Sequence, residues 1–224
     1  MKLVIIESCG ANFLSVTTAF ERLGVSYHLS NDARVIKAAD AVILPGVGSA
    51  GFAMQKLHED GLIDVIRNLK QPVLGICLGM QLLYDFSEED NVECLGIISG
   101  KITKFPNKNS LIIPHMGWNN LQAKTHDPII SDLYVNELQL NENSGLLSEY
   151  KEKNETHIIF KQDVYFVHSY YAPITQATIA STEYGINFTA IAGHNNFYGM
   201  QFHPEKSGWV GAKLLENFIR VVIL

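Results

Sequence analysis

The chain has 224 residues, of which 47% are hydrophobic and 18% are charged, and its formal net charge is −6. This hydrophobic content supports a packed core and excludes disorder over most of the chain. The acidic balance argues against a protein that grips nucleic acid through its phosphates. No apolar run approaches the roughly 20 residues that cross a bilayer. We therefore expect a globular protein with no nucleic acid and no membrane as partners.

Neither the N-terminal residues nor the cysteines indicate export. The apolar run after Met1 is interrupted at Glu7, which is too early for a signal peptide. The three cysteines, Cys9, Cys77 and Cys94, form no C-x-x-C pair, so we expect neither a disulfide framework nor a structural zinc site. The sequence predicts a cytoplasmic protein without a metal or cofactor, in which at least one cysteine is buried or reactive.

Strand-like and helix-like segments alternate in the first half of the chain. Short apolar runs predict buried strands at residues 3–6, 25–29, 41–44 and 72–76. Apolar residues at helical spacing predict helices over residues 12–24, 53–66 with a break at Gly61, and 78–86. This rhythm is typical of an α/β fold in which helices cover both faces of a parallel sheet.

The second half is rich in strand-like segments and contains little helix. We expect strands over residues 97–105, 111–114, 157–170, 177–181, 188–192 and 197–202, and a final helix over 208–222. They predict an antiparallel or mixed part of the same sheet, or a second small sheet. A polar stretch at about 130–160, rich in Asn, Glu, Lys and Ser, is interpreted as a solvated insertion, with a partner-contacting lobe as the alternative.

The segment Gly75-Ile76-Cys77-Leu78-Gly79 follows a predicted strand and precedes a predicted helix. A nucleophile between two glycines at such a junction is typical of a nucleophile elbow, whose tight turn leaves no room for flanking side chains. The helix N-terminus favours a thiolate on Cys77, and the N–H of Leu78 would point toward a developing oxyanion. The alternative is an ordinary buried cysteine.

A nucleophilic cysteine requires a base, and the base requires a group that orients it. In Gln201-Phe202-His203-Pro204-Glu205, the His203 and Glu205 side chains are two residues apart and can project from the same side of an extended segment. Glu205 would hold one ring nitrogen of His203 while the other faces Cys77. The alternative is an ordinary histidine at the end of a strand.

A third element, Pro45-Gly46-Val47-Gly48, also follows a predicted strand. Its free N–H groups could bind an oxyanion or a carboxylate, and the absence of a G-K-[ST] ending argues against a nucleotide-binding loop. A plain turn is the alternative. All three elements lie at strand ends, where open α/β sheets bind their ligands.

Together these motifs resemble the signature of class I (triad) glutamine amidotransferases. Residues 114–119, Pro-His-Met-Gly-Trp-Asn, and 165–170, Tyr-Phe-Val-His-Ser-Tyr, look like those of the glutaminase subunits (HisH) of imidazole glycerol phosphate synthase. The resemblance covers nearly the whole chain except roughly 130–160. It implies one domain over residues 1–224 with the flavodoxin-like α/β fold of that family.

The resemblance implies that L-glutamine is hydrolysed to glutamate and ammonia through a γ-glutamyl thioester on Cys77, with His203 as acid and base and Glu205 orienting it. The implied oxyanion hole comprises N–H groups around Val47, Gly48 and Leu78. The residues implied to hold the amine and carboxylate of glutamine are Gly46, Gly48, Gln81, Ser169 and Tyr170. Without the resemblance, the alternative for Gln81 is a residue on the face of a helix that forms a local hydrogen bond. For Ser169 and Tyr170 the alternative is packing at the end of a strand.

The resemblance also implies a heterodimer with a cyclase subunit, a (β/α)8 barrel. Ammonia would pass through that barrel to make imidazole glycerol phosphate and an aminoimidazole carboxamide nucleotide (AICAR) in histidine biosynthesis. Asn12, Met116 and Trp118 are the expected interface residues, although a buried core position is equally compatible with the pattern around Trp118. Residues 7–12 depart from the Asp-Tyr-Gly-x-Gly-Asn stretch of many relatives, since they keep Asn12 and lose the tyrosine.

Three other interpretations remain open at this point. The first is a HisH-like paralogue that supplies ammonia to a sugar-modifying synthase for surface polysaccharide, which the long polar stretch would suit. The second is a stand-alone cysteine hydrolase or peptidase, against which the His-Pro-Glu and Ser-Tyr motifs argue. The third is a scaffold without activity, which an intact set of Cys77, His203 and Glu205 disfavours.

Overall fold

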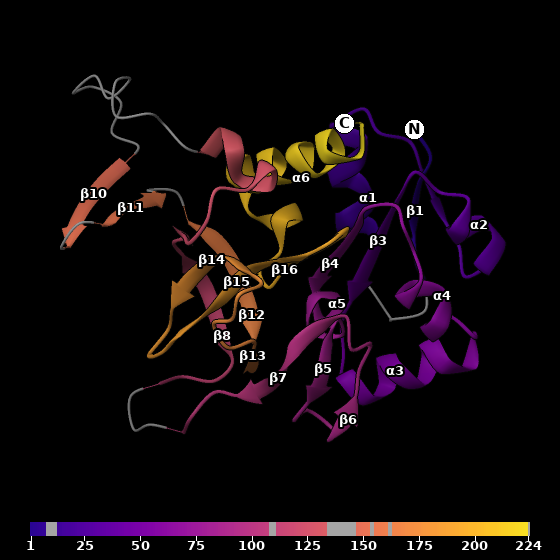
Figure 1. Ribbon diagram of the computed structural model, residues 1–224, viewed down its shortest axis with the longest axis horizontal. Helices are drawn as coiled ribbons and strands as arrows, with labels where there is room; N and C mark the ends of the chain where they lie inside the picture. The colour runs from indigo at the N-terminus through magenta and orange to yellow at the C-terminus, as the bar shows by residue number, and fades with distance from the viewer. Residues whose placement is uncertain (8–12, 108–110, 134–146, 153–154, 161–162, 224) are drawn as a thin grey trace.

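Five parallel strands form one half of the main sheet (Figure 1). The computed structural model describes residues 1–7, 13–107, 111–133, 147–152, 155–160 and 163–223. The parallel strands are, in spatial order, β2 (Tyr27–Leu29), β1 (Leu3–Ile5), β3 (Ala41–Gly46), β4 (Val73–Cys77) and β16 (Phe197–Met200). Every residue of β1, β3 and β4 is buried, as in a sheet that is covered on both faces. The predicted α/β architecture is therefore confirmed.

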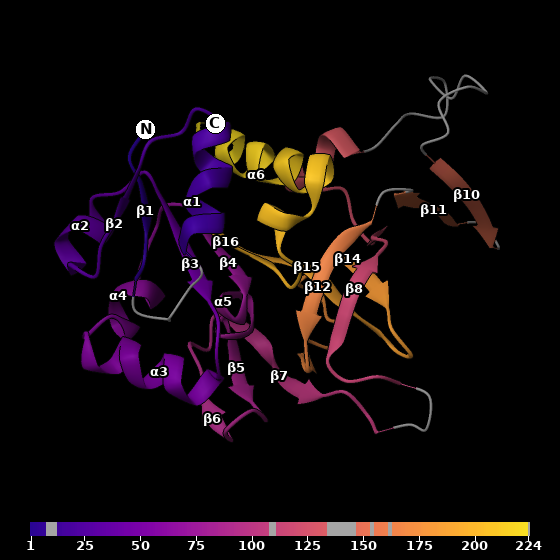
Figure 2. The same cartoon turned by 180° about the vertical axis from the view of Figure 1, so that it is seen from behind.

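Alternating side chains of β1 belong to two hydrophobic clusters, one on each face of the sheet. Leu3 and Ile5 share a cluster with residues of α1 (Phe13–Arg22) and α6 (Gly208–Ile223). Val4 belongs to the other cluster, with residues of three helices: α2 (Ala33–Lys37), α3 (Ala50–Glu59) and α4 (Ile63–Arg67). Figure 2 shows α6 and α3 on opposite sides of the strands. No helix in the described ranges is both long and apolar enough to span a bilayer.

Antiparallel strands continue the same sheet beyond β16. They are, in spatial order, β15 (Asn187–His194), β14 (Thr178–Glu183), β9 (Gln122–Ala123), β11 (Glu155–Phe160) and β10 (Leu147–Glu152). The described part of the predicted polar insertion thus supplies the last two strands of the sheet, with β10 at its edge. It also contains a 3-10 helix, η1 (Pro128–Leu133), whose Ile129 and Ile130 are fully buried and which packs against α6. This end of the stretch is therefore core, not a solvated insertion.

The helix predicted over 78–86 is wrong beyond its first turn. Helix α5 (Leu78–Gln81) is followed by strand β5 (Tyr84–Ser87), which belongs to a second sheet. The order of that sheet is β13 (Tyr170–Tyr171), β7 (Ile98–Lys104), β5 and β6 (Val92–Glu93). A short apolar run does not distinguish helix from strand, and here the distant partner β7 decides the outcome.

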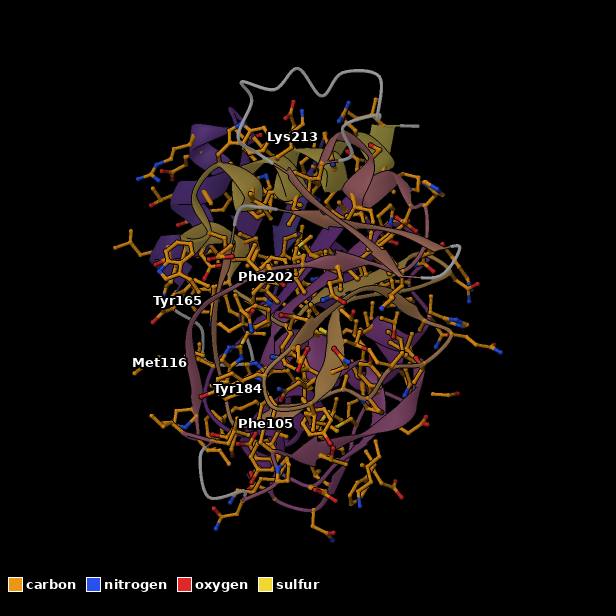
Figure 3. The ribbon with its side chains drawn as sticks, turned by 90° about the vertical axis from the view of Figure 1, so that its left-hand side faces the viewer. Phe105, Met116, Tyr165, Tyr184, Phe202 and Lys213 are labelled. Carbon is orange, nitrogen blue, oxygen red and sulfur yellow. The ribbon has the colours of Figure 1, made fainter. Side chains whose placement is uncertain are left out.

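Strands β8 (His115–Asn119) and β12 (Val164–His168) pair antiparallel in a two-stranded sheet, called here the ribbon. The strand predicted over 111–114 is wrong, because no residue of that range is in a strand; β8 begins at His115, directly after Pro114, which has no N–H for a ladder. One face of the ribbon is buried and carries His115, Phe166 and His168. Met116 lies on the opposite, exposed face, and Figure 3 shows it at the edge of the molecule.

Candidate active site

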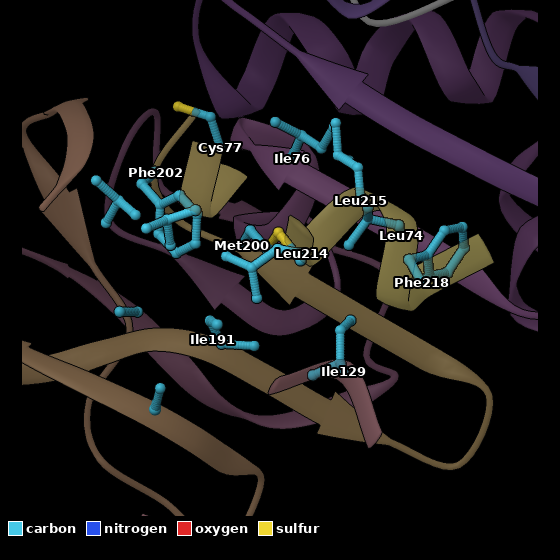
Figure 4. Close-up of a cluster of buried hydrophobic side chains, with 14 of the residues drawn as sticks. Leu74, Ile76, Cys77, Ile129, Ile191, Met200, Phe202, Leu214, Leu215 and Phe218 are labelled. Atoms are coloured by element: carbon cyan, nitrogen blue, oxygen red, sulfur yellow. The ribbon is translucent and has the colours of Figure 1, made fainter. Parts of the chain in front are cut away.

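Cys77 joins β4 to α5 in a strained backbone conformation, with φ 54° and ψ −110°. The turn is tight enough that a Cβ on Gly75 would lie 2.6 Å from the Gly79 carbonyl oxygen, and a Cβ on Gly79 would lie 1.8 Å from the Leu44 carbonyl oxygen. Only glycine fits at both positions. Figure 4 shows the Cys77 sulfur directed away from the cluster that contains Ile76. The geometry is that of the predicted nucleophile elbow.

His203 follows β16, the parallel neighbour of β4, so both side chains emerge from the same end of the sheet. Its Nδ1 lies 2.7 Å from Glu205 Oε1, and the two side chains are only 8% and 4% exposed. Because a carboxylate only accepts hydrogen bonds, Nδ1 carries a proton and donates a hydrogen bond to Glu205. The other nitrogen, Nε2, is buried and has no hydrogen-bond partner in the part of the chain described.

The backbone of His203 is fixed to the ribbon from both sides. Its N–H donates to the Tyr165 carbonyl at 2.9 Å. The Ser207 hydroxyl donates to the His203 carbonyl at 2.6 Å and accepts from the Tyr165 N–H at 2.9 Å. Ser207 is buried, so these bonds are shielded from water. They hold the base against β12, whose Val167 carbonyl accepts from the Cys77 thiol at 3.9 Å.

Opposing influences act on the protonation of His203. Burial lowers its pKa, but interactions with Cys77 and Glu205 outweigh burial and raise the pKa to about 10. The imidazolium is therefore the favoured form of His203 at neutral pH, and it lies beside the Cys77 side chain. Such a pair is suited to nucleophilic attack followed by protonation of a leaving group.

The predicted oxyanion-hole and substrate residues surround one cavity of about 300 Å³ with Cys77 and His203. Its wall includes Gly46, Val47, Gly48, Leu78, Gln81, Ser169 and Tyr170. Gly48 has a positive φ of 95°, and Leu78 is the first residue of α5, so its N–H has no partner within the helix. The cavity brings all the predicted site residues of these two groups together.

Gln81 does not bond locally as an ordinary helix residue would. Its amide nitrogen donates at 3.0 Å both to the Tyr170 carbonyl and to Gln201 Oε1. These bonds join α5 to strand β13 and to the residue that follows β16, and they fix the Gln81 side chain beside the cavity. Interpreted without the family resemblance, Gln81 was expected to bond locally within its helix, and that expectation is wrong.

Glu89 is a cavity residue that sequence reasoning missed. It supplies a carboxylate to the cavity wall, and its Oε2 accepts from the Ala50 N–H at 3.0 Å. Burial raises the pKa of Glu89, so a cation placed beside it would relieve an unfavourable charge. In the sequence Glu89 is one member of the acidic run 88–90, which reads as a solvated loop and gives no signal of a binding role.

Met116 and Trp118 lie on the outer face of the ribbon and are 66% and 57% exposed. Trp118 contacts Tyr165 edge-on, with ring centroids 5.6 Å apart. The structure thus places Trp118 at the surface rather than in the core. Asn12 and Cys9 lie outside the described residues. No group of three or more His, Cys, Asp or Glu side chains in the described ranges could hold a metal ion.

Solved structures similar to this chain share its fold. A putative GMP synthase protein from Thermoplasma acidophilum superposes with a TM-score of 0.66 over 100% of this chain and 94% of its own, at 17% identity. A glutamine amidotransferase from Thermotoga maritima gives a TM-score of 0.56 over 99% of this chain and 81% of its own, at 15% identity.

Sequence comparison gives a more specific result. The family described as "Glutamine amidotransferase class-I" matches residues 5–222. "Imidazole glycerol phosphate synthase subunit HisH" of Idiomarina loihiensis is 43% identical over 100% of both chains. The proteins of the same name from Haemophilus influenzae and Bacteroides fragilis are also 43% identical, over 99% of this chain and 98% and 100% of theirs. The chain therefore belongs to the class I glutamine amidotransferases, within the HisH subunits of imidazole glycerol phosphate synthase.

Proposed function

We propose that residues 1–224 act as one glutaminase domain, which hydrolyses L-glutamine to glutamate and ammonia and supplies the ammonia to a cyclase subunit in histidine biosynthesis. The observation that carries the proposal is a single cavity in which an elbow cysteine and a histidine–carboxylate pair share the wall with a glycine-rich turn. The HisH relatives, named as subunits of imidazole glycerol phosphate synthase, supply the pathway.

In the first half of the reaction the Cys77 thiolate attacks the side-chain carbonyl carbon of glutamine. The negative charge moves to the carbonyl oxygen, where N–H groups of Val47, Gly48 and Leu78 stabilise it. Collapse of this intermediate breaks the C–N bond, and the imidazolium of His203 gives its Nε2 proton to the departing ammonia. A γ-glutamyl thioester remains on the sulfur.

In the second half His203 is neutral and takes a proton from water, which attacks the thioester carbonyl. Breakage of the C–S bond releases glutamate and restores the thiolate and imidazolium. Glu205 accepts from Nδ1 throughout, which keeps Nε2 directed toward the reacting atoms and stabilises the imidazolium each time it forms. Burial of both side chains strengthens this interaction.

The α-amino and α-carboxylate groups of glutamine bind at the wall of the same cavity. We assign Glu89 to the α-ammonium group, because it contributes a carboxylate to the cavity that Gly48 and Gln81 also line. Ser169 and Tyr170 remain available for the α-carboxylate. Glu89→Gln should raise KM for glutamine about tenfold or more, because it removes a hydrogen bond between two charged groups. Glu88→Gln is the matched control, since Glu88 bonds Lys104 and Lys101 instead.

The cyclase subunit, a (β/α)8 barrel, is proposed to dock on the outer face of the ribbon. Met116 and Trp118 present exposed apolar surface there, next to β12, which bonds the His203 backbone and faces Cys77. Large exposed apolar side chains are frequent anchors of protein interfaces. Asn12 is included in this interface from the family resemblance.

The test is glutamate release from L-glutamine by the chain alone, and by the chain with the cyclase subunit and its nucleotide ligand. Cys77→Ser is the blank, and Cys94→Ser controls for loss of a buried thiol away from the cavity. Activity that rises with the loaded cyclase and disappears only in Cys77→Ser supports the proposal. Reaction of Cys77 with a glutamine analogue but no response to the cyclase would assign another synthase partner. Failure of Cys77 to react with any glutamine analogue would overturn the glutaminase assignment.

A further inference from the structure

Two buried histidines beside the cavity take no part in the reaction proposed above. His115 and His168 are directly opposite each other in the ribbon and are 3% and 6% exposed. His115 Nδ1 lies 3.1 Å from His168 Nε2. His168 also lines the cavity, whereas His115 does not. A hydrogen-bonded histidine pair buried this deeply requires an explanation, because each ring costs desolvation unless its polar atoms are paired.

The Tyr170 carbonyl oxygen, which His168 contacts, fixes the direction of both hydrogen bonds of the histidine pair. His168 Nδ1 lies 2.7 Å from the Tyr170 carbonyl oxygen, which can only accept, so His168 Nδ1 carries a proton. In a neutral ring Nε2 is then the acceptor, and His115 Nδ1 must donate to it. Burial lowers the pKa of both histidines, which favours these neutral forms. Both rings are thus fixed as Nδ1–H tautomers.

Ring packing alone does not require histidine at position 115. The His115 ring stacks on Tyr184, with centroids 4.0 Å apart, and on Phe166 at 4.9 Å. Tyr184 is partly buried and packs against the hydrophobic cluster that contains Phe166; it is labelled in Figure 3. Phenylalanine would offer a similar flat ring to this aromatic cluster. What it could not offer is the Nδ1–H that His168 accepts, so the donor atom is the distinguishing property of His115.

The hydrogen bonds lead to the proposed glutamine-binding segment. The Tyr170 carbonyl accepts both from His168 and from the Gln81 amide, so donors from the ribbon and from α5 converge on one oxygen. Ser169 lies between His168 and Tyr170 in the sequence and lines the cavity. The positions of Ser169 and Tyr170 therefore depend on His168 keeping its Nδ1 proton toward the Tyr170 carbonyl.

We propose that His115 is a positioning residue for glutamine binding: by donating to His168 it fixes the tautomer that holds Ser169 and Tyr170 at the cavity wall. The proposal rests on the proposed glutaminase function. Its effect is expected on KM for glutamine rather than on kcat, because the pair contacts neither the Cys77 sulfur nor the His203 ring by a hydrogen bond. A loss of about tenfold in glutamine affinity corresponds to one hydrogen bond.

The test compares His115→Phe with His115→Asn, in the complex with the cyclase subunit if the chain requires it for activity. Phenylalanine keeps the stacked ring and removes the donor, whereas the asparagine amide restores a donor near the position of Nδ1. We expect His115→Phe to raise KM for glutamine about tenfold with kcat within about threefold of the original, and His115→Asn to recover most of that loss. Equal KM in His115→Phe and the original protein, or failure of asparagine to recover it, overturns the proposal.

Two further readouts keep this result distinct from other failures. The rate of Cys77 alkylation by a chloroketone analogue of glutamine should fall in His115→Phe, while alkylation by iodoacetamide should not. If the original protein shows no glutaminase activity, the proposed function fails, yet the histidine pair is still tested by nitrogen-15 NMR of the original protein. Nδ1–H tautomers for both His115 and His168 support the proposal, and an Nε2–H tautomer at either residue overturns it, whether or not the variants fold.

Discussion

Acidification should destabilise this protein through the two histidines of the ribbon. Burial holds the pKa of His115 at about 4 and also lowers that of His168, so both stay neutral in the folded protein at pH 5. In the unfolded chain each has a pKa of about 6.5 and takes up a proton. The stability that this neutral pair contributes is therefore complete above about pH 6.5 and decreases as the pH falls below it.

The magnitude follows from the pKa difference. Between pH 6.5 and pH 5, each neutral histidine contributes a loss of about 2 kcal/mol, at 1.36 kcal/mol per pH unit. The pair together contributes about 4 kcal/mol, a large part of the roughly 5–15 kcal/mol that stabilises a typical domain. Because His203 has a raised pKa, its contribution is already complete below pH 6.5 and does not offset this loss.

Urea unfolding at pH 7 and pH 5 measures the effect, and His115→Phe isolates it. The variant lacks one of the two histidines and keeps all other titrating groups. Between pH 7 and pH 5, the original protein should therefore lose about 2 kcal/mol more of its free energy of unfolding than the variant does. Equal losses in the two proteins would show that His115 is protonated in the folded state and would refute the reasoning.

Three further predictions concern the site and, by comparison with Cys77, the buried thiol of Cys94 away from it. Glu205→Gln keeps a hydrogen-bond acceptor for His203 but removes the negative charge of the carboxylate. The variant should lower kcat for glutamate release by about 100-fold. It should also lower the pKa of His203, which the pH profile of Cys77 alkylation would show. Gly79→Ala should lower the free energy of unfolding by about 3 kcal/mol or more, because its Cβ would overlap a backbone oxygen 1.8 Å away. Cys94 should resist iodoacetamide at neutral pH while Cys77 reacts, because burial raises the pKa of Cys94 to about 12, as peptide mass spectrometry would show.

Each of these predictions has a matched comparison. Gly193→Ala would meet the flexible end of the Ile179 side chain rather than backbone, so its cost should be clearly smaller than that of Gly79→Ala. Equal costs would contradict the close-packing argument for the elbow. Alkylation of Cys94 as fast as Cys77 would contradict the burial argument, and an unchanged alkylation profile in Glu205→Gln would show that its carboxylate does not set the protonation of His203.

The sequence predicted best where the local pattern and the tertiary environment agree. Runs 41–44 and 72–76 are short and uncharged, as in strands that are covered on both faces, and every residue of the observed strands β3 and β4 is buried. The glycines around Cys77 were equally informative, since the close backbone contacts at Gly75 and Gly79 admit no other residue. The spacing of His203 and Glu205 also predicted their contact.

The sequence predicted poorly where a distant partner decides the outcome. Residues 84–87 form a strand because β7 pairs with them, a fact that no local spacing contains. Glu89 looks like any acidic loop residue until α3 and the cavity are placed beside it. The His115–His168 bond required the register of β8 against β12, which two strands separated by more than forty residues do not reveal in their own sequences.

Strand β16 pairs in parallel with β4 on one side and antiparallel with β15 on the other. Cys77 is the last residue of β4, and His203 lies three residues beyond the end of β16, so two adjacent strands deliver the nucleophile and the base to one end of the sheet. Gly46 still pairs with Cys77 in the ladder, whereas Val47 and Gly48 lie beyond the end of β3. The peptide proposed to stabilise the oxyanion can therefore turn without breaking a ladder hydrogen bond, while the strand that carries the nucleophile stays in place.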